Sequence, residues 1–188
     1  KYMAGGSLRD KIKSSTPMSI NDITQMLKTI SQALDFTHKN HIIHRDIKPD
    51  NILYDEHGVA YVHDFGVAKR LKSDTITRAD VMIGSPAYLS PEQISKHPIT
   101  PQTDVYIMAI TLFEALTKRH PYHDAHTKMQ LILKHLQSTL PSIAEYRNDI
   151  PAEVDNVLRI ASAKTPDARY SSMGELFEAF RSAVAVTE

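Results

Sequence analysis

The chain has 188 residues, of which 41% are hydrophobic, so it is long enough to form one domain with a substantial core. Its 22 Lys and Arg residues balance its 22 Asp and Glu residues, which argues against electrostatic binding of nucleic acid or of an anionic membrane. The absence of cysteine excludes disulfides and thiolate metal sites. The longest apolar run, VYIMAITLF, is far short of the ~20 residues that a membrane span needs, so we expect no membrane contact by this segment.

The first third of the chain carries two helix signals. Ser7 and Asp10 have the spacing of a capping box and predict a short helix. Ser19 and Asp22 repeat this spacing before a longer amphipathic pattern, which ends near residues 39–40.

The middle of the chain has a different pattern. ILY and VAYVH are short β-type runs joined by the turn DEHG, in which Gly58 can adopt a positive φ. Residues 70–100 show no sustained periodicity, and we expect a long ordered loop there.

Helical patterns return at Asp104, where DVYIMAITLFEALTK is apolar almost all round and predicts a buried central helix. The last capping box is formed by Ser172 and Glu175. Further helices are expected near residues 124–137, 152–163 and 172–185. The predicted fold is therefore mainly α, a helical bundle around a buried central helix with a small β-hairpin.

Four polar residues stand at the ends of the two β runs: Asp46, Lys48, Asn51 and Asp64. A tight hairpin would bring Asn51 close to Asp64, and their oxygen atoms suit Mg²⁺, which takes one or two protein ligands besides water and phosphate. Lys48 is a compact cation suited to a transferring phosphoryl group. Asp46 would then accept the proton of an attacking hydroxyl.

The blocks HRDIKPDN, DFG and SPE, in this order, resemble the protein kinases. The resemblance runs from KYMAGGSL to DARY, and GSPAYLSPEQ and DVY make it closest to the bacterial, eukaryotic-like serine/threonine kinases. It implies that residues 1–188 form the C-terminal lobe, starting at the hinge, with the small N-terminal lobe as a partner outside this chain. It also implies ATP and Mg²⁺ as cofactors, a protein Ser or Thr as acceptor, and a cytoplasmic catalytic lobe; a membrane anchor elsewhere in the protein is left open.

The resemblance assigns roles to the four polar residues. Asp46 would be the catalytic base, Lys48 would contact the γ-phosphate, and Asn51 and Asp64 would hold Mg²⁺. The nucleotide would be bound by the backbone of Lys1 and Met3, the side chain of Leu53, and Lys48, Asn51 and Asp64.

Other residues are expected to support this site. His44 and Phe65 should pack to hold the catalytic loop and the DFG turn in register. Asp104 should be the N-cap of the central helix, and by the resemblance it also tethers the catalytic-loop backbone. Glu92 and Arg169 should form a buried ion pair, as in kinases.

Arg45 suggests regulation by phosphorylation, since its guanidinium can hold a phosphate in a bidentate grip. Thr75 or Thr77, in the loop between DFG and SPE, would be the switch site, with phosphorylation ordering the loop against Arg45. The alternative is that both are ordinary loop hydroxyls. Autophosphorylation of this loop would take place in a kinase dimer.

Other interpretations remain open from the sequence. The Gly-rich loop, strand Lys and helix Glu of kinases are not found, so this segment alone is expected to be inactive, and a pseudokinase scaffold is the non-enzyme alternative. A small-molecule phosphotransferase of the aminoglycoside or choline type shares an HxDxxxxN loop. His120, His123 and His126 also invite a zinc site.

Overall fold

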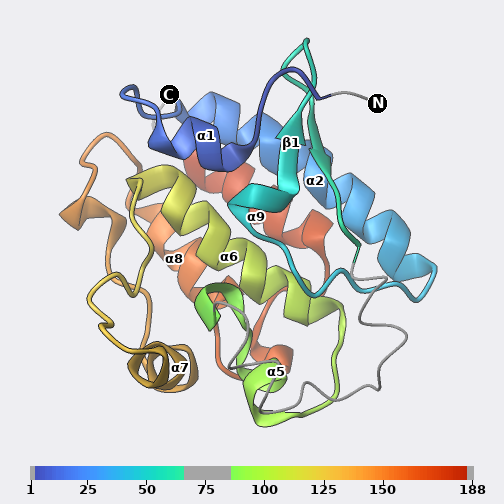
Figure 1. Cartoon of the computed structure of the whole chain (residues 1–188), viewed down its shortest axis with the longest axis vertical. Helices are drawn as coiled ribbons and strands as arrows, with labels where there is room; N and C mark the ends of the chain where they lie inside the picture. Colours follow the sequence, from blue (N-terminus) through green and yellow to red (C-terminus); the bar gives the residue numbers. More distant parts are fainter. Residues whose placement is uncertain (1–2, 66–85, 186–188) are drawn as a thin grey trace.

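The computed structural model describes residues 3–65 and 86–185, and within them the chain is mainly α-helical around a buried central helix, α6 (Figure 1). This confirms the predicted fold class. The described helices are α1 (Leu8–Lys13), α2 (Ile20–Lys39), α5 (Pro91–Ser95), α6 (Pro101–Thr117), α7 (Lys128–Gln137), α8 (Glu153–Ala161) and α9 (Met173–Ala185). The strands are β1 (Ile52–Tyr54) and β2 (Ala60–Val62), and 3₁₀ turns occur at η1 (Pro49–Asn51), η2 (Pro86–Tyr88), η3 (Ile143–Glu145) and η4 (Pro166–Ala168).

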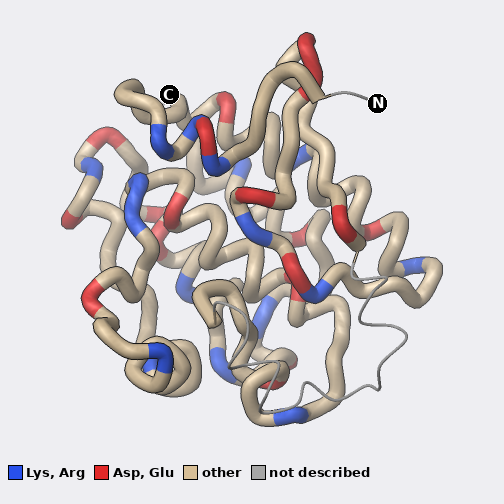
Figure 2. The backbone as a smooth tube through the Cα atoms, viewed as in Figure 1, with Lys and Arg blue, Asp and Glu red and all other residues tan. Residues whose placement is uncertain are grey.

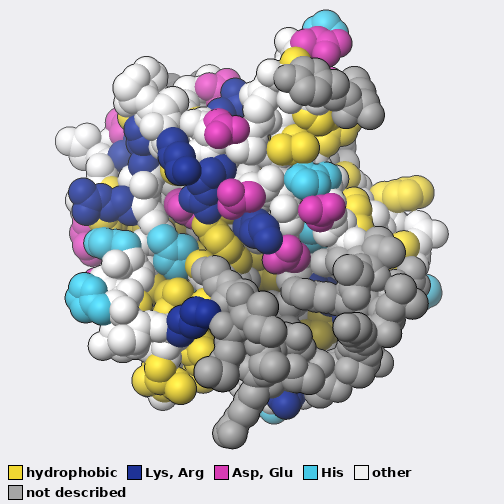
Figure 3. Space-filling view, viewed as in Figure 1, with side chains coloured by type: hydrophobic (Ala, Val, Ile, Leu, Met, Phe, Trp, Pro, Cys, Tyr) yellow, Lys and Arg dark blue, Asp and Glu magenta, His cyan; other side chains and the backbone are white. Residues whose placement is uncertain are grey.

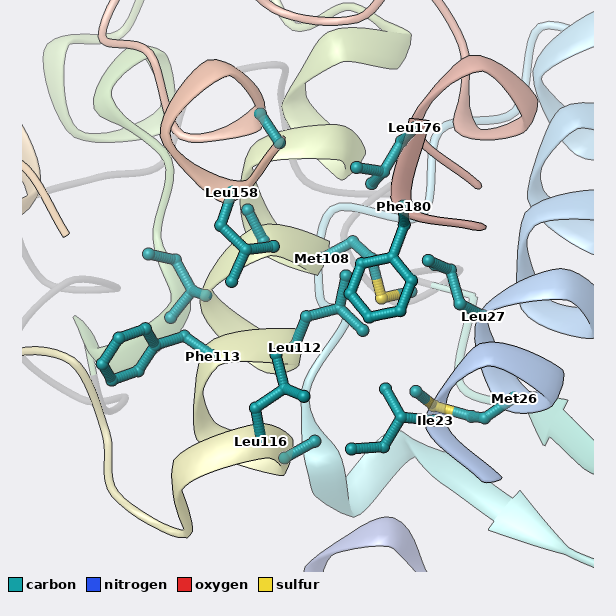
Figure 4. Close-up of a cluster of buried hydrophobic side chains, with 14 of the residues drawn as sticks. Ile23, Met26, Leu27, Met108, Leu112, Phe113, Leu116, Leu158, Leu176 and Phe180 are labelled. Carbon is teal, nitrogen blue, oxygen red and sulfur yellow. The ribbon is translucent and has the colours of Figure 1, made fainter. Parts of the chain in front are cut away.

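The core surrounds α6, which is buried on every side from Thr103 to Thr117. α9 packs against both α2 and α8, while α6 contacts α2, α8 and α9. Figure 4 shows the apolar contact between these helices, in which Phe180 of α9 faces Met108 of α6 and Leu27 of α2. All three are inaccessible to solvent, so this contact belongs to the core around α6.

The N-terminus of α9 is capped by a residue of α2. Asp35 accepts hydrogen bonds from the N–H groups of Met173 (3.0 Å) and Gly174 (2.9 Å). A Cβ at residue 174 would lie 2.8 Å from Asp35 Oδ2, so only glycine fits here without displacement. The predicted Ser172–Glu175 box is only half formed, because the Glu175 carboxylate accepts instead from Ser171.

The predicted start of the central helix was wrong. The N-cap is Thr100, whose N–H donates to Thr103 Oγ1 (3.3 Å), and Pro101 occupies the first helical position. Asp104 lies inside the first turn and is not the N-cap. Its carboxylate instead accepts hydrogen bonds from the loop that contains His44 and Arg45, as described below.

Two other boundaries differ from the prediction. The segment expected to be loop up to residue 100 contains η2 and the short helix α5, which a capping box of Ser90 and Gln93 opens. α7 begins at Lys128 rather than near residue 124, because Thr127 and Gln130 form its capping box.

The hairpin forms as predicted. β1 and β2 pair antiparallel, with Ile52 opposite Val62 and Tyr54 opposite Ala60, and Gly58 in the turn has φ +77°. On the other side of β1, the N–H of Gly5 donates to the carbonyl of Tyr54 (2.9 Å). Among the described helices, none combines the length and the apolar character needed to cross a bilayer.

Candidate active site

Asp46, Lys48 and Asn51 meet on the loop between α2 and β1. Lys48 Nζ lies 2.9 Å from Asp46 Oδ2, and Asn51 Nδ2 donates to the same oxygen (3.1 Å) and to the Asp46 carbonyl (2.8 Å). η1, with Pro49 at its first position, folds the chain back so that Asn51 reaches Asp46. Asn51 is buried, whereas the Asp46 side chain is 36% exposed, so an incoming hydroxyl can reach the carboxylate.

The contacts of Asn51 orient its amide. The amide nitrogen makes both hydrogen bonds to Asp46, so the carbonyl oxygen Oδ1 is the atom of this side chain that could bind a metal ion. The Asn51 backbone carbonyl accepts from the N–H of His63 (3.0 Å) and so continues the hairpin pairing.

Asp64 therefore follows directly after the residue that pairs with Asn51. Its backbone has a left-handed φ of +59°, and its side chain is 76% exposed, with Oδ1 3.5 Å from His63 Nδ1. Hydrogen bonds thus join Asp46, Lys48 and Asn51 directly, whereas Asp64 is one residue beyond the backbone partner of Asn51 and its carboxylate faces solvent.

The backbone of Arg45 is held in an unfavourable conformation next to Asp46. Its φ is +68°, a region that non-glycine residues rarely adopt. Its N–H donates to Asp104 Oδ1 (2.9 Å) and its carbonyl accepts from Gln93 Nε2 (3.0 Å), while the N–H of His44 donates to Asp104 Oδ2 (2.9 Å). Asp104, whose side chain is completely buried in the first turn of α6, thus tethers the loop. Because Asp46 follows Arg45 directly, these contacts also orient the backbone that carries Asp46.

His44 links the loop that carries Asp46 to the end of β2. Its Nδ1 accepts from the N–H of Asp46 (3.3 Å), and its Nε2 therefore donates to the carbonyl of His63 (3.0 Å). Burial lowers the pKa of His44, in keeping with this neutral form. The His44 ring packs on Phe65 with 4.7 Å between ring centroids, so both residues have the packing position expected of them.

The expected ion pair between Glu92 and Arg169 is present and buried. Arg169 donates to both carboxylate oxygens (2.7 and 2.8 Å), and Thr103 donates to one of them (2.7 Å). Burial opposes the charge on Glu92, but the bonds from Arg169 and Thr103 prevail and lower its pKa overall. The pair holds α5, and with it Gln93, against the first turn of α6.

The expected nucleotide contacts are only partly described. Leu53 lies between the N-terminal segment and β2, bridging to Ser7 on one side and pairing with Tyr61 on the other, and Met3 belongs to that same N-terminal segment. Lys1, Thr75 and Thr77 lie outside the described residues, so the hinge role of Lys1 and the switch role of the two threonines remain predictions.

The zinc alternative finds no support in the described residues. Both ring nitrogens of His120 are engaged, Nε2 with the carbonyl of Ala87 (2.7 Å) and Nδ1 with the N–H of Tyr122 (3.2 Å). In residues 3–65 and 86–185, no group of three or more His, Asp or Glu side chains is arranged to hold a metal ion.

Two residues that shape the site, Gln93 and Arg9, were not predicted from the sequence. Gln93, which holds the Arg45 carbonyl, could have been found from the capping-box spacing of Ser90 and Gln93. Arg9 could not, because its partners lie 41 to 105 residues away along the chain.

A protein-family model matches almost the whole chain. The family model described as Protein kinase domain matches residues 1–180. This chain belongs to the protein kinase domain family. The kinase motifs quoted above, the mainly α fold and the small hairpin are all consistent with it.

Similar proteins carry serine/threonine kinase names. The kinase domain is 38% identical over 176 residues to the serine/threonine-protein kinase PrkC of Bacillus subtilis, covering 94% of this chain and 27% of that protein. It is 36% identical over 176 residues to the probable serine/threonine-protein kinase PknB of Lactococcus lactis, covering 94% of this chain and 28% of that protein. The chain thus spans about a quarter of the length of these relatives.

A solved structure shows the same fold. The crystal structure of a double mutant of the Mycobacterium tuberculosis PknI kinase domain matches with a TM-score of 0.74 at 20% identity. The match covers 97% of this chain and 63% of that one.

Proposed function

We propose that this chain is the C-terminal lobe of a serine/threonine protein kinase, which transfers the γ-phosphoryl group of ATP to a Ser or Thr hydroxyl of a protein. The observation that carries the proposal is the Asp46 carboxylate, which is solvent-accessible and is held by Lys48 and Asn51 on a loop that Asp104 ties down. Serine/threonine kinase names among relatives at 36–38% identity support the same reaction.

The chemistry assigned to the loop is proton transfer and charge stabilisation. The substrate hydroxyl oxygen attacks the γ-phosphorus, the bond from that phosphorus to the bridging oxygen of ADP breaks, and the hydroxyl proton passes to Asp46. Lys48, 2.9 Å from Asp46, keeps a positive charge where the transferring group gathers negative charge. The hydrogen bonds of the Arg45 backbone to Asp104 and Gln93 would keep the Asp46 carboxylate in position for the reaction.

The donor set beside this loop fits Mg²⁺. Asn51 offers Oδ1 and Asp64 offers a carboxylate. Mg²⁺ usually binds one or two oxygen ligands from the protein and completes its coordination with water and phosphate oxygens. When bound, Mg²⁺ would neutralise the phosphate oxygens of ATP. The exposed Asp64 side chain has room to rotate toward Asn51.

The rest of the kinase apparatus completes the proposal. The adenine would lie over Leu53, against the backbone of Lys1 and Met3, and an N-terminal lobe would cover the phosphates. Phosphorylation of Thr75 or Thr77, in a dimer, would order its loop against Arg45. The catalytic lobe would act in the cytoplasm, where ATP is available.

Phosphate transfer by the full-length protein tests this proposal. With radiolabelled ATP, Mg²⁺ and a mixture of Ser and Thr peptides, wild-type protein should label the peptides, and Asp46→Asn should reduce the rate by about 10²–10⁴-fold. Asp167→Asn, the same change on the exposed turn η4, serves as the matched control and should keep the wild-type rate. ATP binding by a wild-type protein that transfers nothing would favour the scaffold alternative, and equal rates in Asp46→Asn and wild type would contradict the catalytic role.

A further inference from the structure

Arg9 of α1 connects three segments that are distant in sequence. Its Nη1 donates to Glu114 Oε1 of α6 (2.5 Å), and its Nη2 donates to Tyr88 Oη of η2 (2.6 Å). Nε and Nη2 also donate to Asp50 Oδ2 of η1, at 3.3 and 3.2 Å. The Tyr88 hydroxyl in turn donates to the other oxygen of Glu114. Arg9 thus fills the space between two carboxylates, those of Asp50 and Glu114, which we call the acidic pair.

The acidic pair is neutralised only in part. Glu114 is nearly buried, with 8% of its side chain exposed, Arg9 is 21% exposed, and Asp50 is 53% exposed at the outer end. Burial raises the pKa of Tyr88, so the phenol is neutral and adds no charge. One guanidinium therefore faces two carboxylates, and loss of its charge would leave two negative charges at a site where one is buried.

The acidic pair lies next to the proposed catalytic loop. Asp50 is part of η1, between Lys48 and Asn51, which both contact Asp46. Figure 2 shows basic and acidic residues alternating along this loop, between α2 and β1. Figure 3 shows basic and acidic side chains gathered together over α1 and the neighbouring part of α6.

This position is within reach of a bound protein substrate. A peptide whose hydroxyl meets Asp46 places its neighbouring residues at about 3.3–3.6 Å intervals when extended. A long basic side chain only a few residues from the acceptor could therefore reach Asp50. Such a side chain would meet the carboxylates of Asp50 and Glu114, which now bind Arg9 and which suit the forked donors of a guanidinium.

We propose that Arg9 is a specificity-determining residue: by occupying the acidic pair of Asp50 and Glu114, it withholds these carboxylates from basic side chains of the protein substrate. The inference rests on the proposed kinase function and adds a substrate class to it. The wild-type enzyme has no preference for Arg or Lys at the positions that would face the acidic pair. Removal of the Arg9 charge creates such a preference.

The test is a peptide array in which Arg, Lys or Ala is fixed at each position flanking one Ser or Thr, phosphorylated by the full-length protein. Two variants remove the charge in different ways: Arg9→Gln keeps a hydrogen-bond donor for Glu114 and Tyr88, and Arg9→Met keeps the apolar stem. Arg9→Lys keeps the charge and serves as the matched control. Thermal unfolding identifies which charge-removing variant is folded, and a folded one is compared with wild type.

We expect a flat profile for wild type and for Arg9→Lys. Arg9→Gln or Arg9→Met should gain about tenfold in kcat/KM for peptides with Arg at one or two positions, as expected for a new charge-assisted contact. Adding Glu114→Gln to the same variant should reduce that gain. A purely structural role for Arg9 would change the overall rate and leave the profile flat.

The outcomes separate this inference from the proposed function. Phosphate transfer with a flat profile in a folded charge-removing variant overturns the inference alone. A wild-type preference for Arg at these positions also overturns it. A wild-type protein that transfers no phosphate overturns the proposed function, and the inference falls with it.

Discussion

The buried carboxylate of Asp104 holds the backbone of Arg45 in a left-handed conformation. The Arg45 N–H lies 2.9 Å from Asp104 Oδ1 at a φ of +68°, and the neighbouring N–H of His44 lies 2.9 Å from Oδ2. The two N–H groups of this loop therefore each need one of the two carboxylate oxygens of Asp104 as their acceptor. Because Asp46 follows Arg45, the geometry of the proposed catalytic base depends on a residue of another helix.

Asp104→Asn should therefore both destabilise the protein and slow phosphate transfer. An amide has one acceptor oxygen, so one of the two N–H groups would face an NH₂ group and lose its partner. Hydrogen bonds to charged groups contribute about 1.5–3 kcal/mol each, and we expect a loss of at least that size in the free energy of unfolding. Urea unfolding measures the stability, and steady-state kinetics should show a lower kcat with little change in the KM for ATP. A loss of stability below about 0.5 kcal/mol, the size of an ordinary surface change, would show that the tether is dispensable.

Glu92→Gln should destabilise the protein by about 3–5 kcal/mol at neutral pH, because it leaves the Arg169 guanidinium buried without a counter-charge. The exposed pair of Glu178 and Arg181 provides the matched control, and Glu178→Gln should cost less than about 1 kcal/mol.

The effect of Glu92→Gln should also depend on pH. The pKa of Glu92 in the folded protein lies below its usual value of 4.5, so near that pH the unfolded chain binds more protons than the folded one. The stabilisation by Glu92 is complete above pH 4.5 and is lost as the pH falls through the lowered pKa. Urea unfolding of wild type and variant should therefore give a difference that shrinks below pH 4.5; a constant difference would contradict an ionised Glu92.

His135 should make the protein less stable in mild acid. Its Nε2 donates to the Ala87 carbonyl (2.9 Å), and burial lowers its pKa from 6.5 to about 3. Between these two values the unfolded chain binds a proton that the folded chain does not. The free energy of unfolding should thus fall with pH below 6.5, by up to about 1.4 kcal/mol per pH unit for this group.

Measurements of the free energy of unfolding between pH 7 and pH 5 test the predicted effect of His135. His135→Asn should reduce the dependence of stability on pH by the contribution of about one proton. His57→Asn serves as control because the His57 side chain is 77% exposed. Identical slopes for wild type and His135→Asn would show that His135 is not buried in its neutral form.

Features set by residues close together in the chain could be predicted from the sequence, whereas contacts between distant residues could not. The capping spacing of Ser7 and Asp10 and the ILY–VAYVH hairpin were predicted because each is set by residues close together in the chain. Asp104 was mistaken for an N-cap because the apolar run begins there, although Pro101 already marks the first helical position. The sequence does not show which loop the buried Asp104 carboxylate binds, because that contact depends on tertiary packing.

Contacts across the fold had no signal in the sequence. Arg9 reads as a surface residue of a short helix, yet it contacts Asp50, Tyr88 and Glu114. Kinase motifs identified the proposed catalytic residues because the resemblance supplied their roles. No motif identified Arg9, and only the folded arrangement shows that its charge occupies the acidic pair.

A crystal structure of the full-length protein with Mg²⁺ and a non-hydrolysable ATP analogue tests the central claim most directly. The account predicts a Mg²⁺ ion with Asn51 Oδ1 and an Asp64 carboxylate oxygen as ligands at about 2.0–2.1 Å, and Asp46 facing the γ-phosphate. Nucleotide bound while the Asp64 carboxylate still points to solvent, with no metal between it and Asn51, would contradict the account.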